Sequence, residues 1–281
     1  MSWTTNLRFC LGLAFFVLIG KLQSQPEYAK ELWSVYNQAP DFKKRKEAYT
    51  KLEKFYSLYH LDSALVISMQ FKEEVLRKQP DFAPFVDVRI AATYTRLLEF
   101  EKSADILIPL LESAEKAGND TLRAKVLHTL SNLNHAQKQK ELALQRAREA
   151  ALLFSKLNLW SDLCAAYNAI FIYYSAVNQD SAFHYLDKMQ SIADKHDLNE
   201  VKATVANNRG VLYHINQDLE KALGFYEKAV FYEKKMDGRY GLCFNLVNIG
   251  YINRDLNRWD EAKKWFDEAL PVCTSCGNVE G

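Results

Sequence analysis

Six alanines recur at nearly constant spacing along the sequence, and no other feature restricts the fold as strongly. Consecutive members are 40, 39, 39, 40 and 40 residues apart. A period of this length is typical of repeat arrays, in which each repeat is one supersecondary unit that packs on its neighbours. The alanines are Ala64, Ala104, Ala143, Ala182, Ala222 and Ala262.

The last two copies show what one repeat contains. Each has two segments with helical periodicity, and a polar pair at 217–218 or 257–258 separates them, so one repeat is predicted to be a helical hairpin. Helices approach closely only where side chains are short, which places Gly210 and Ala222 at the crossing and Tyr226 in the wider space toward the neighbouring repeat. The positions that match at an offset of 40 are Asn208 and Asn248, Gly210 and Gly250, Ala222 and Ala262, Tyr226 and Phe266, and Ala229 and Ala269.

This pattern resembles the tetratricopeptide repeat family, in its longer variety of about 40 residues per repeat. The resemblance covers residues 41–273 and implies an all-α, right-handed superhelical solenoid of about six stacked helical hairpins. The sequence departs from the family where Ala206 and Leu246 replace a favoured Trp. The scarcity of Gly (10) and Pro (6), together with 48% apolar residues, also favours a folded helical chain.

Proline and glycine mark the predicted boundaries outside the two best copies. Pro40 ends a leading helix within 25–40, Pro80 separates the first two copies, and Gly118 ends another helix. Pro109 lies well inside a predicted helix, so a kink or an early end is expected there.

The first 24 residues have the pattern of a secretory signal peptide. Arg8 ends a short first region, an apolar stretch of 12 residues follows at 9–20, and Ser24 is small enough to precede the cleavage site. The stretch is too short to span a bilayer, which takes roughly 20 apolar residues. The protein is therefore expected to be exported, in bacteria to the periplasm.

The C-terminal residues 274–281 are expected to be a tail at the start of a missing repeat, because Gly281 corresponds to Gly241 in the repeat register. Contact with a membrane is expected only through an uncleaved leader or a missing C-terminal part. Exported arrays of this kind resemble the sensor portion of bacterial signalling receptors, whose later sequence holds an output domain.

The charge balance argues against binding to nucleic acid. The chain has 36 basic and 35 acidic residues, and two of the basic ones, Arg8 and Lys21, lie in the predicted leader. Removal of the leader leaves a net charge of −1. A protein that neutralises many phosphates needs a basic excess, which this chain lacks.

Neither a catalytic motif nor a cofactor-binding motif is present. The six histidines are scattered; His128 and His135 share a helix face, but they are two turns apart and too distant to hold one metal ion. We therefore predict that the protein is not an enzyme and that it has neither a cofactor nor a metal site.

The cysteines leave several interpretations open. Cys273 and Cys276 form a lone CxxC pair, for which coincidence at a helix end, a local disulfide and a metal site are the alternatives. Cys164 and Cys243 lie on apolar first helices and are expected to be buried small hydrophobes.

The first helices of stacked hairpins line the concave side, where side chains are free to contact a ligand. By register, the predicted groove consists of Arg96, His135, Tyr167, Asn168, Phe171, Tyr174, Asn208, Val211, His214, Asn248, Tyr251 and Arg254. The same face is expected to include Arg89, Thr93, His128 and Asn132. This mixture of aromatics, amides and a few cations suits an extended peptide or a partner's helix.

Three of these residues, Asn168, Asn208 and Asn248, recur at intervals of 40 and suggest a ladder of amides. Such a ladder could pair with the backbone of a bound peptide, or each amide could bond across to the next repeat and fix the stacking. The leading hypothesis is an exported sensor module that binds a peptide or protein segment. A structural assembly scaffold without a switching role is the alternative.

Overall fold

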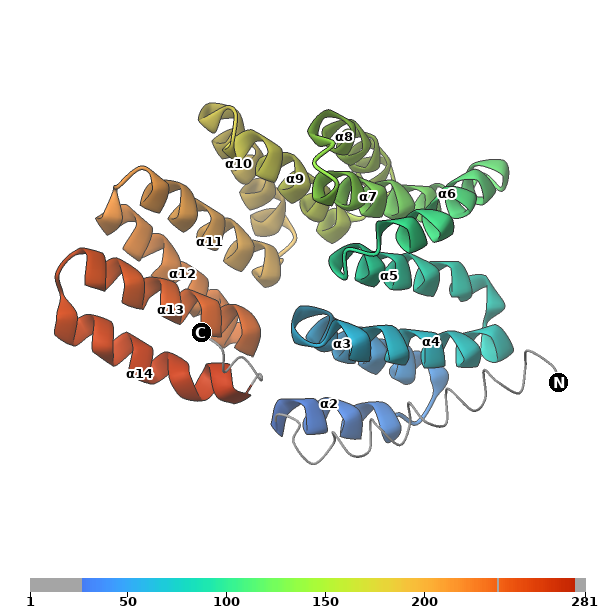
Figure 1. The fold of residues 1–281 in the computed structure, drawn as a ribbon, viewed down its shortest axis with the longest axis horizontal. Coiled ribbons are helices and arrows are strands. Elements are labelled where there is room, and N and C mark those ends of the chain that lie inside the picture. Colours follow the sequence, from blue (N-terminus) through green and yellow to red (C-terminus); the bar gives the residue numbers. More distant parts are fainter. Residues whose placement is uncertain (1–26, 237, 276–281) are drawn as a thin grey trace. The chain divides into compact units, whose positions relative to one another are not determined.

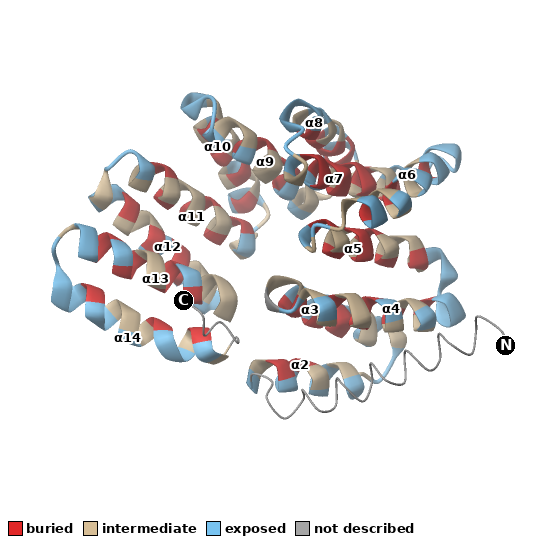
Figure 2. Ribbon diagram, in the orientation of Figure 1, coloured by how far each residue is buried: buried red, intermediate tan, exposed pale blue. Residues whose placement is uncertain are grey.

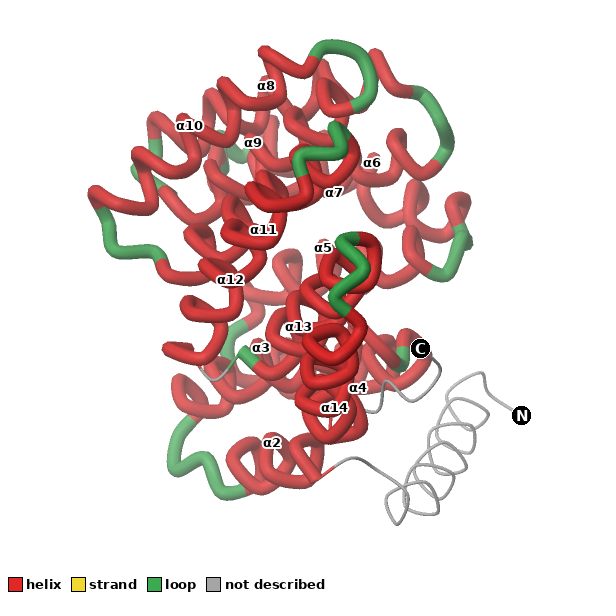
Figure 3. Tube along the Cα trace, turned by 90° about the vertical axis from the view of Figure 1, so that its left-hand side faces the viewer, coloured by secondary structure: helices red, strands yellow, loops and turns green. Residues whose placement is uncertain are grey.

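The computed structural model describes residues 27–236 and 238–275. These residues form thirteen α-helices and one short 3-10 helix, and the described ranges contain no strand (Figure 1). The predicted all-α class is therefore confirmed, and short connections join the helices (Figure 3). The predicted leader, residues 1–24, lies outside the described residues.

The chain divides into two compact units, and the described helices of the first unit are α2 (Glu27–Asn37), α3 (Phe42–Tyr59) and α4 (Leu61–Lys78). The Tyr49 ring of α3 stacks on Phe71 of α4 with 4.0 Å between centroids, and its hydroxyl is 2.9 Å from Ser68 Oγ. The indole of Trp33 donates to the Tyr56 hydroxyl at 2.9 Å and ties α2 to α3. The predicted leading helix is thus α2.

The second unit, residues 81–273, consists of helical hairpins whose consecutive helices pack on one another. Successive first helices, α5, α7, α9, α11 and α13, also touch each other. The buried residues form stripes where the helices meet (Figure 2). After a 3-10 turn (Pro80–Phe82) come α5 (Ala83–Arg96), α6 (Phe100–Lys116), α7 (Asp120–Ala136), α8 (Lys140–Lys156), α9 (Trp160–Ser175), α10 (Gln179–Lys195), α11 (Asn199–Ile215), α12 (Leu219–Met236), α13 (Arg239–Asp255) and α14 (Trp259–Ser275).

Left-handed residues close most turns of the second unit. They are Leu98, Gly118, Lys138, Asn158, Asp197, Gln217 and Asn257, with φ between 49° and 64°. The next residue bonds back across the helix end, as Glu99 N–H does to the Tyr94 carbonyl at 2.9 Å. Only one of the seven is a glycine, so the turns are regular in space although the sequence is poor in turn residues.

The second repeat is one residue out of the predicted register. In α8 the buried Ala143 is the fourth residue, and its N–H bonds to the Gln139 carbonyl just before the helix. In α6 the residue with this role is Ser103, whose N–H bonds to the Glu99 carbonyl, whereas Ala104 is only partly buried. The repeat is therefore centred on Ser103 and not on Ala104. A serine is tolerated there because its hydroxyl lies 2.8 Å from Thr95 Oγ1.

Replacing Ser103 by alanine tests this register. Thr95 keeps its bond to the Ala91 carbonyl at 3.1 Å, so the substitution removes one buried hydrogen bond without leaving an unpaired hydroxyl. We expect Ser103→Ala to lower the free energy of unfolding by about 0.5 to 1.5 kcal/mol in urea titrations. The control Ala104→Ser should change it by less than about 0.5 kcal/mol. An equal loss in both variants would contradict the corrected register.

The aromatic side chain of each strong repeat packs inside its own hairpin. A Cβ atom on Gly210 would lie 2.7 Å from Tyr226 Cε1, and the Tyr226 ring is 2% exposed. Phe266 covers Gly250 in the same way. Tyr226 also belongs to the buried cluster that contains Leu246 and Ile249 of α13, so it covers Gly210 within its hairpin and packs toward the neighbouring repeat as expected.

Pro109 does not end its helix. Helix α6 continues through this residue to Lys116, so the expected early end was wrong. Pro109 and Asp105, whose carbonyl loses its helical partner, are both exposed. Water can therefore replace the missing hydrogen bond.

Candidate binding face on the first helices

Three of the predicted groove residues on α9 are packing residues. The Tyr174 hydroxyl accepts a hydrogen bond from Arg148 Nη2 at 2.7 Å, and its ring stacks on Tyr185 at 5.8 Å. Tyr167 lies 5.5 Å from the same Tyr185 ring, and Phe171 is 5% exposed in the core shared by α9, α10 and α11. Their assignment to the groove was wrong, because these aromatics form the stripe of α9 that faces the neighbouring helices.

Two of the three amides of the predicted ladder bond to each other within the protein. Asn208 Nδ2 donates to Asn168 Oδ1 at 2.7 Å across two repeats, and Asn207 Nδ2 approaches Asn208 Oδ1 at 3.3 Å. The half-buried Asn248 side chain has no hydrogen-bond partner among the described residues. A stacking role thus accounts for Asn168 and Asn208, and Asn248 keeps its donors and acceptor for another molecule.

A charged cluster lies where α11 and α13 end. His214 Nε2 is 3.5 Å from Asp255 Oδ2, and the Arg254 guanidinium donates to Asp255 Oδ1 at 2.9 and 3.0 Å. These partners hold the pKa of the Asp255 carboxyl below its ordinary value, with Arg254 as the main cause. The Arg254 side chain lies over the Tyr251 ring, 5.0 Å from its centroid, and Tyr251 remains 41% exposed. Val211 is half-buried against the core beside α13.

The polar residues of α5 and α7 divide between the surface and the interior. Arg96, Asn132 and His135 are exposed as predicted for a groove. Thr93 is 1% exposed and bonds to the Arg89 carbonyl, so its assignment to the face was wrong. His128 was also placed wrongly, because its ring packs against Phe154 of α8.

The His128 ring packs edge-on against Phe154 at 6.4 Å, on the side of α7 that faces α8. Its Nδ1 atom is buried without a hydrogen-bond partner. Burial is the main reason why the pKa of His128 falls to about 4, with the Asp162 carboxylate opposing the shift and Lys125 adding to it. The residue is therefore a neutral packing histidine at physiological pH.

Three exposed apolar residues on the first helices were not predicted from the sequence. Ile172 on α9, Ile215 on α11 and Phe244 on α13 are 41%, 66% and 41% exposed. The available signal was an apolar residue outside the core stripe, but Ile172 and Phe244 adjoin buried residues and cannot be told from that stripe in the sequence. The face is consequently more apolar than predicted.

A hollow opens beside the turn between α7 and α8, with a volume of about 310 Å³ including its mouth. Asn132 and His135 from α7, Lys140 from α8 and Tyr173 from α9 contribute its polar side chains. No hydrogen bond or ion pair joins any of these four side chains to the rest of the described protein. They are available to a ligand.

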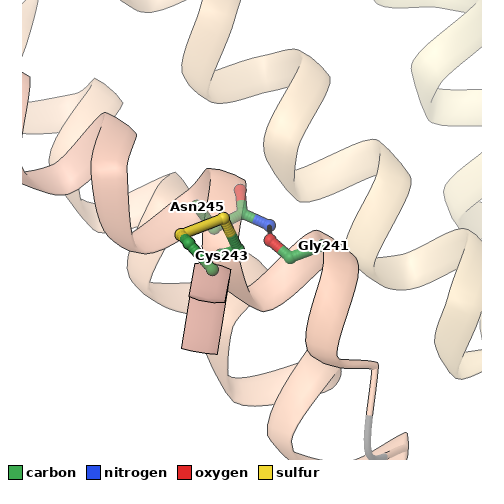
Figure 4. Close-up of a disulfide and its surroundings, with 4 residues drawn as sticks. Gly241, Cys243 and Asn245 are labelled. Atoms are coloured by element: carbon green, nitrogen blue, oxygen red, sulfur yellow. Dashed lines mark hydrogen bonds between the residues drawn. A yellow bond between two sulfur atoms is a disulfide. The ribbon is translucent and has the colours of Figure 1, made fainter. Parts of the chain in front are cut away.

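Cys243 and Cys273 form a disulfide between α13 and α14, with 5.1 Å between their Cα atoms (Figure 4). The expectation that Cys243 is a free hydrophobe was wrong, and Cys273 is paired with Cys243 and not with Cys276. Cys276 itself lies outside the described residues. Cys164 is free and buried, and burial raises the pKa of its thiol to about 11. The pairing was missed because the two cysteines are 30 residues apart.

The described part of the chain holds no group of three or more His, Cys, Asp or Glu residues placed to share a metal ion. Within the same ranges, no helix combines the length and apolar character needed to cross a bilayer.

Stacked helical hairpins of this kind define a tetratricopeptide-like repeat protein, and solved structures show the same fold. BtubC from P. vanneervenii superposes with a TM-score of 0.60 at 15% identity, over 79% of this chain and 94% of that one. The signal transduction ATPase with a tetratricopeptide repeat sensor from Pyrococcus horikoshii gives 0.63 at 16% identity, over 89% and 40%. A Rap protein complexed with Competence and Sporulation Factor gives 0.62 at 13% identity, over 89% and 76%. Neither a protein-family model nor a curated protein sequence matches the chain.

Proposed function

We propose that the protein is an exported, non-catalytic repeat scaffold that binds a peptide or protein segment along its first helices, as the sensor part of a signalling protein. The observation that carries the proposal is a set of side chains on these helices that either have no hydrogen-bond partner among the described residues or keep apolar surface exposed. Asn132 and His135 on α7 and Asn248 on α13 offer hydrogen bonds, and Ile172 and Tyr251 offer apolar surface. An extended segment needs both kinds of contact.

The comparisons support the same function by analogy of fold. In one similar structure a tetratricopeptide repeat array is described as the sensor of a signal transduction ATPase, and in another a Rap protein is complexed with Competence and Sporulation Factor. At 13 to 16% identity these likenesses support a binding role and leave the ligand to be found by experiment.

Export is supported by two independent features. The predicted leader at 1–24 directs secretion, and a disulfide such as Cys243–Cys273 persists in oxidising compartments such as the periplasm. The near-neutral net charge gives no reason to expect a nucleic acid as the partner.

A peptide selected from a displayed random library on the oxidised protein tests the binding function. We expect Asn248→Ala to weaken binding of the selected peptide by about 0.5 to 1.5 kcal/mol in fluorescence anisotropy, with an unchanged melting temperature, because this amide has no hydrogen-bond partner among the described residues. Asn208→Ala is the matched contrast: it breaks the bond to Asn168 and should lower the melting temperature. Phe231→Ala, on an exposed site of the second helix α12, should change neither quantity.

Failure to select any peptide would contradict the proposal. So would a selected peptide whose binding is unchanged by Asn248→Ala but weakened by Phe231→Ala. The second outcome would favour a structural assembly scaffold. Its supporting observations are the Asn168–Asn208 bond across repeats and the exposed apolar residues of the second helices, such as Leu152 and Phe231.

A further inference from the structure

The hollow between α7, α8 and α9 is a concave part of the face. The apolar part of its lining, which we call the floor, consists of Ala143 and Leu144 from α8 and Ala169 and Ile172 from α9. Ser131 is the one buried polar residue in the lining, at 2% exposure. Its hydroxyl already donates to the Ala143 carbonyl at 2.7 Å. The floor therefore offers apolar contact and no free hydrogen-bond donor.

The composition of the floor decides which side chain the hollow can take. A carboxylate or amide at the floor would lose its water without gaining a partner, which is unfavourable. An aliphatic side chain gains roughly 25 cal/mol for each Å² of apolar surface that leaves water. The volume of about 310 Å³ includes the open mouth, so the enclosed part is smaller than a cofactor site and suits at most one side chain.

The mouth of the hollow has the opposite character. Lys140, Asn132 and Tyr173 carry N–H and O–H donors, and none of their side chains is paired within the described protein. Backbone carbonyls on either side of a buried side chain would reach such donors, because an extended segment presents its carbonyls beside each residue.

We propose that this hollow is a specificity pocket that receives one aliphatic side chain of the bound segment, with Asn132, Lys140 and Tyr173 bonding the flanking backbone carbonyls. The inference rests on the proposed binding function and adds the class of residue that the segment must carry. His135, at the same mouth, contacts the segment as a polar neighbour.

The pocket can be tested without a known ligand by adding N-acetyl-leucinamide to the full oxidised protein. Methyl NMR should show saturable shifts for Ile172, Ala169 and Leu144, and N-acetyl-glycinamide should produce less than a tenth of the response. Ala169→Leu fills the hollow and should reduce the response at least fivefold. The matched control is Ala165→Leu, an exposed site on the same helix outside the lining, which should leave the response unchanged.

Ile172→Ala provides a second variant that preserves the fold, because Ile172 is already 41% exposed. It should weaken N-acetyl-leucinamide binding at least twofold through loss of the floor. No saturable shift in the unmodified protein, an equal response to the glycine compound, or tighter binding of N-acetyl-glutamate amide would overturn the proposal.

The experiments distinguish an error in the specificity pocket from an error in the proposed binding function. A library-selected peptide that binds through Asn248 but is insensitive to both Ala169→Leu and Ile172→Ala would overturn the pocket and leave the proposed binding function intact. Binding of N-acetyl-leucinamide to the hollow, without selection of any peptide, would overturn the proposed function alone.

Discussion

Opening the Cys243–Cys273 disulfide is expected to lower the free energy of unfolding of the last hairpin by about 3 to 4 kcal/mol. The bond closes a loop with a sequence separation of 30 residues, and in the chain-entropy model a loop of this length restricts the unfolded state by about that amount. Both cysteines are buried, at 1% and 8% exposure, so the free thiols gain no compensating contact with water in the folded state.

The measurement is urea unfolding of the oxidised protein against the Cys243→Ala/Cys273→Ala variant. Because a repeat array is stabilised mainly between neighbouring repeats, hydrogen exchange should accelerate in α13 and α14 and change little in α5 to α8. Cys276→Ser is the control and should retain full stability. A loss in Cys276→Ser as large as in the double variant would show that Cys273 pairs with Cys276 in solution.

The second large effect is expected at Gly210. A valine there would place its Cβ 2.7 to 3.0 Å from three atoms of the Tyr226 ring, closer than non-bonded carbon atoms approach. Tyr226 is 2% exposed and cannot rotate into solvent, so the two helices must separate. We expect Gly210→Val to cost about 3 kcal/mol, at the upper end of the range for overpacked cores, even after the gain in helix propensity.

Two other glycines calibrate this effect in thermal and urea unfolding. Gly250→Val should be at least as destabilising, because an added Cβ would approach Phe266 even more closely. Gly224, on the second helix of the same hairpin as Gly210, has no heavy atom within 4 Å of an added Cβ. Gly224→Val should therefore leave stability unchanged or raise it by up to about 0.5 kcal/mol. A similar loss at Gly210 and Gly224 would show that backbone conformation, and not the contact with Tyr226, determines the cost.

The arrangement of the candidate site was only partly predictable. Asn248, Tyr251 and Arg254 on α13 and Asn132 and His135 on α7 are at least partly open to solvent, where the register places them. Tyr167, Phe171 and Tyr174 are committed to contacts with the second helices and the core. On α9 nearly every residue from Leu163 to Tyr174 is apolar or aromatic, so the apolar pattern was too broad to distinguish the face that meets α10 from the face left open.

The hollow beside Lys140 could not have been predicted in any detail. Its residues come from three helices, and whether space remains between Leu144 and Ile172 depends on how α7, α8 and α9 pack. The exposure of Ile172 likewise follows from packing, since an isoleucine next to a buried Phe171 has no distinguishing feature in the sequence.

The sequence by itself determined the properties that repeat locally: an all-α chain, a period of 40 residues, two helices per repeat and turns at positions 217–218 and 257–258. These follow from periodicity within a helix and from breaker residues, which act over a few positions. Only the tertiary structure decided that Ser103 and not Ala104 occupies the helix crossing, that Tyr226 covers Gly210, and that Cys243 pairs with Cys273. Each of these depends on the distance between residues on different helices or on a one-residue shift in packing, and a periodic pattern along one helix does not contain that distance.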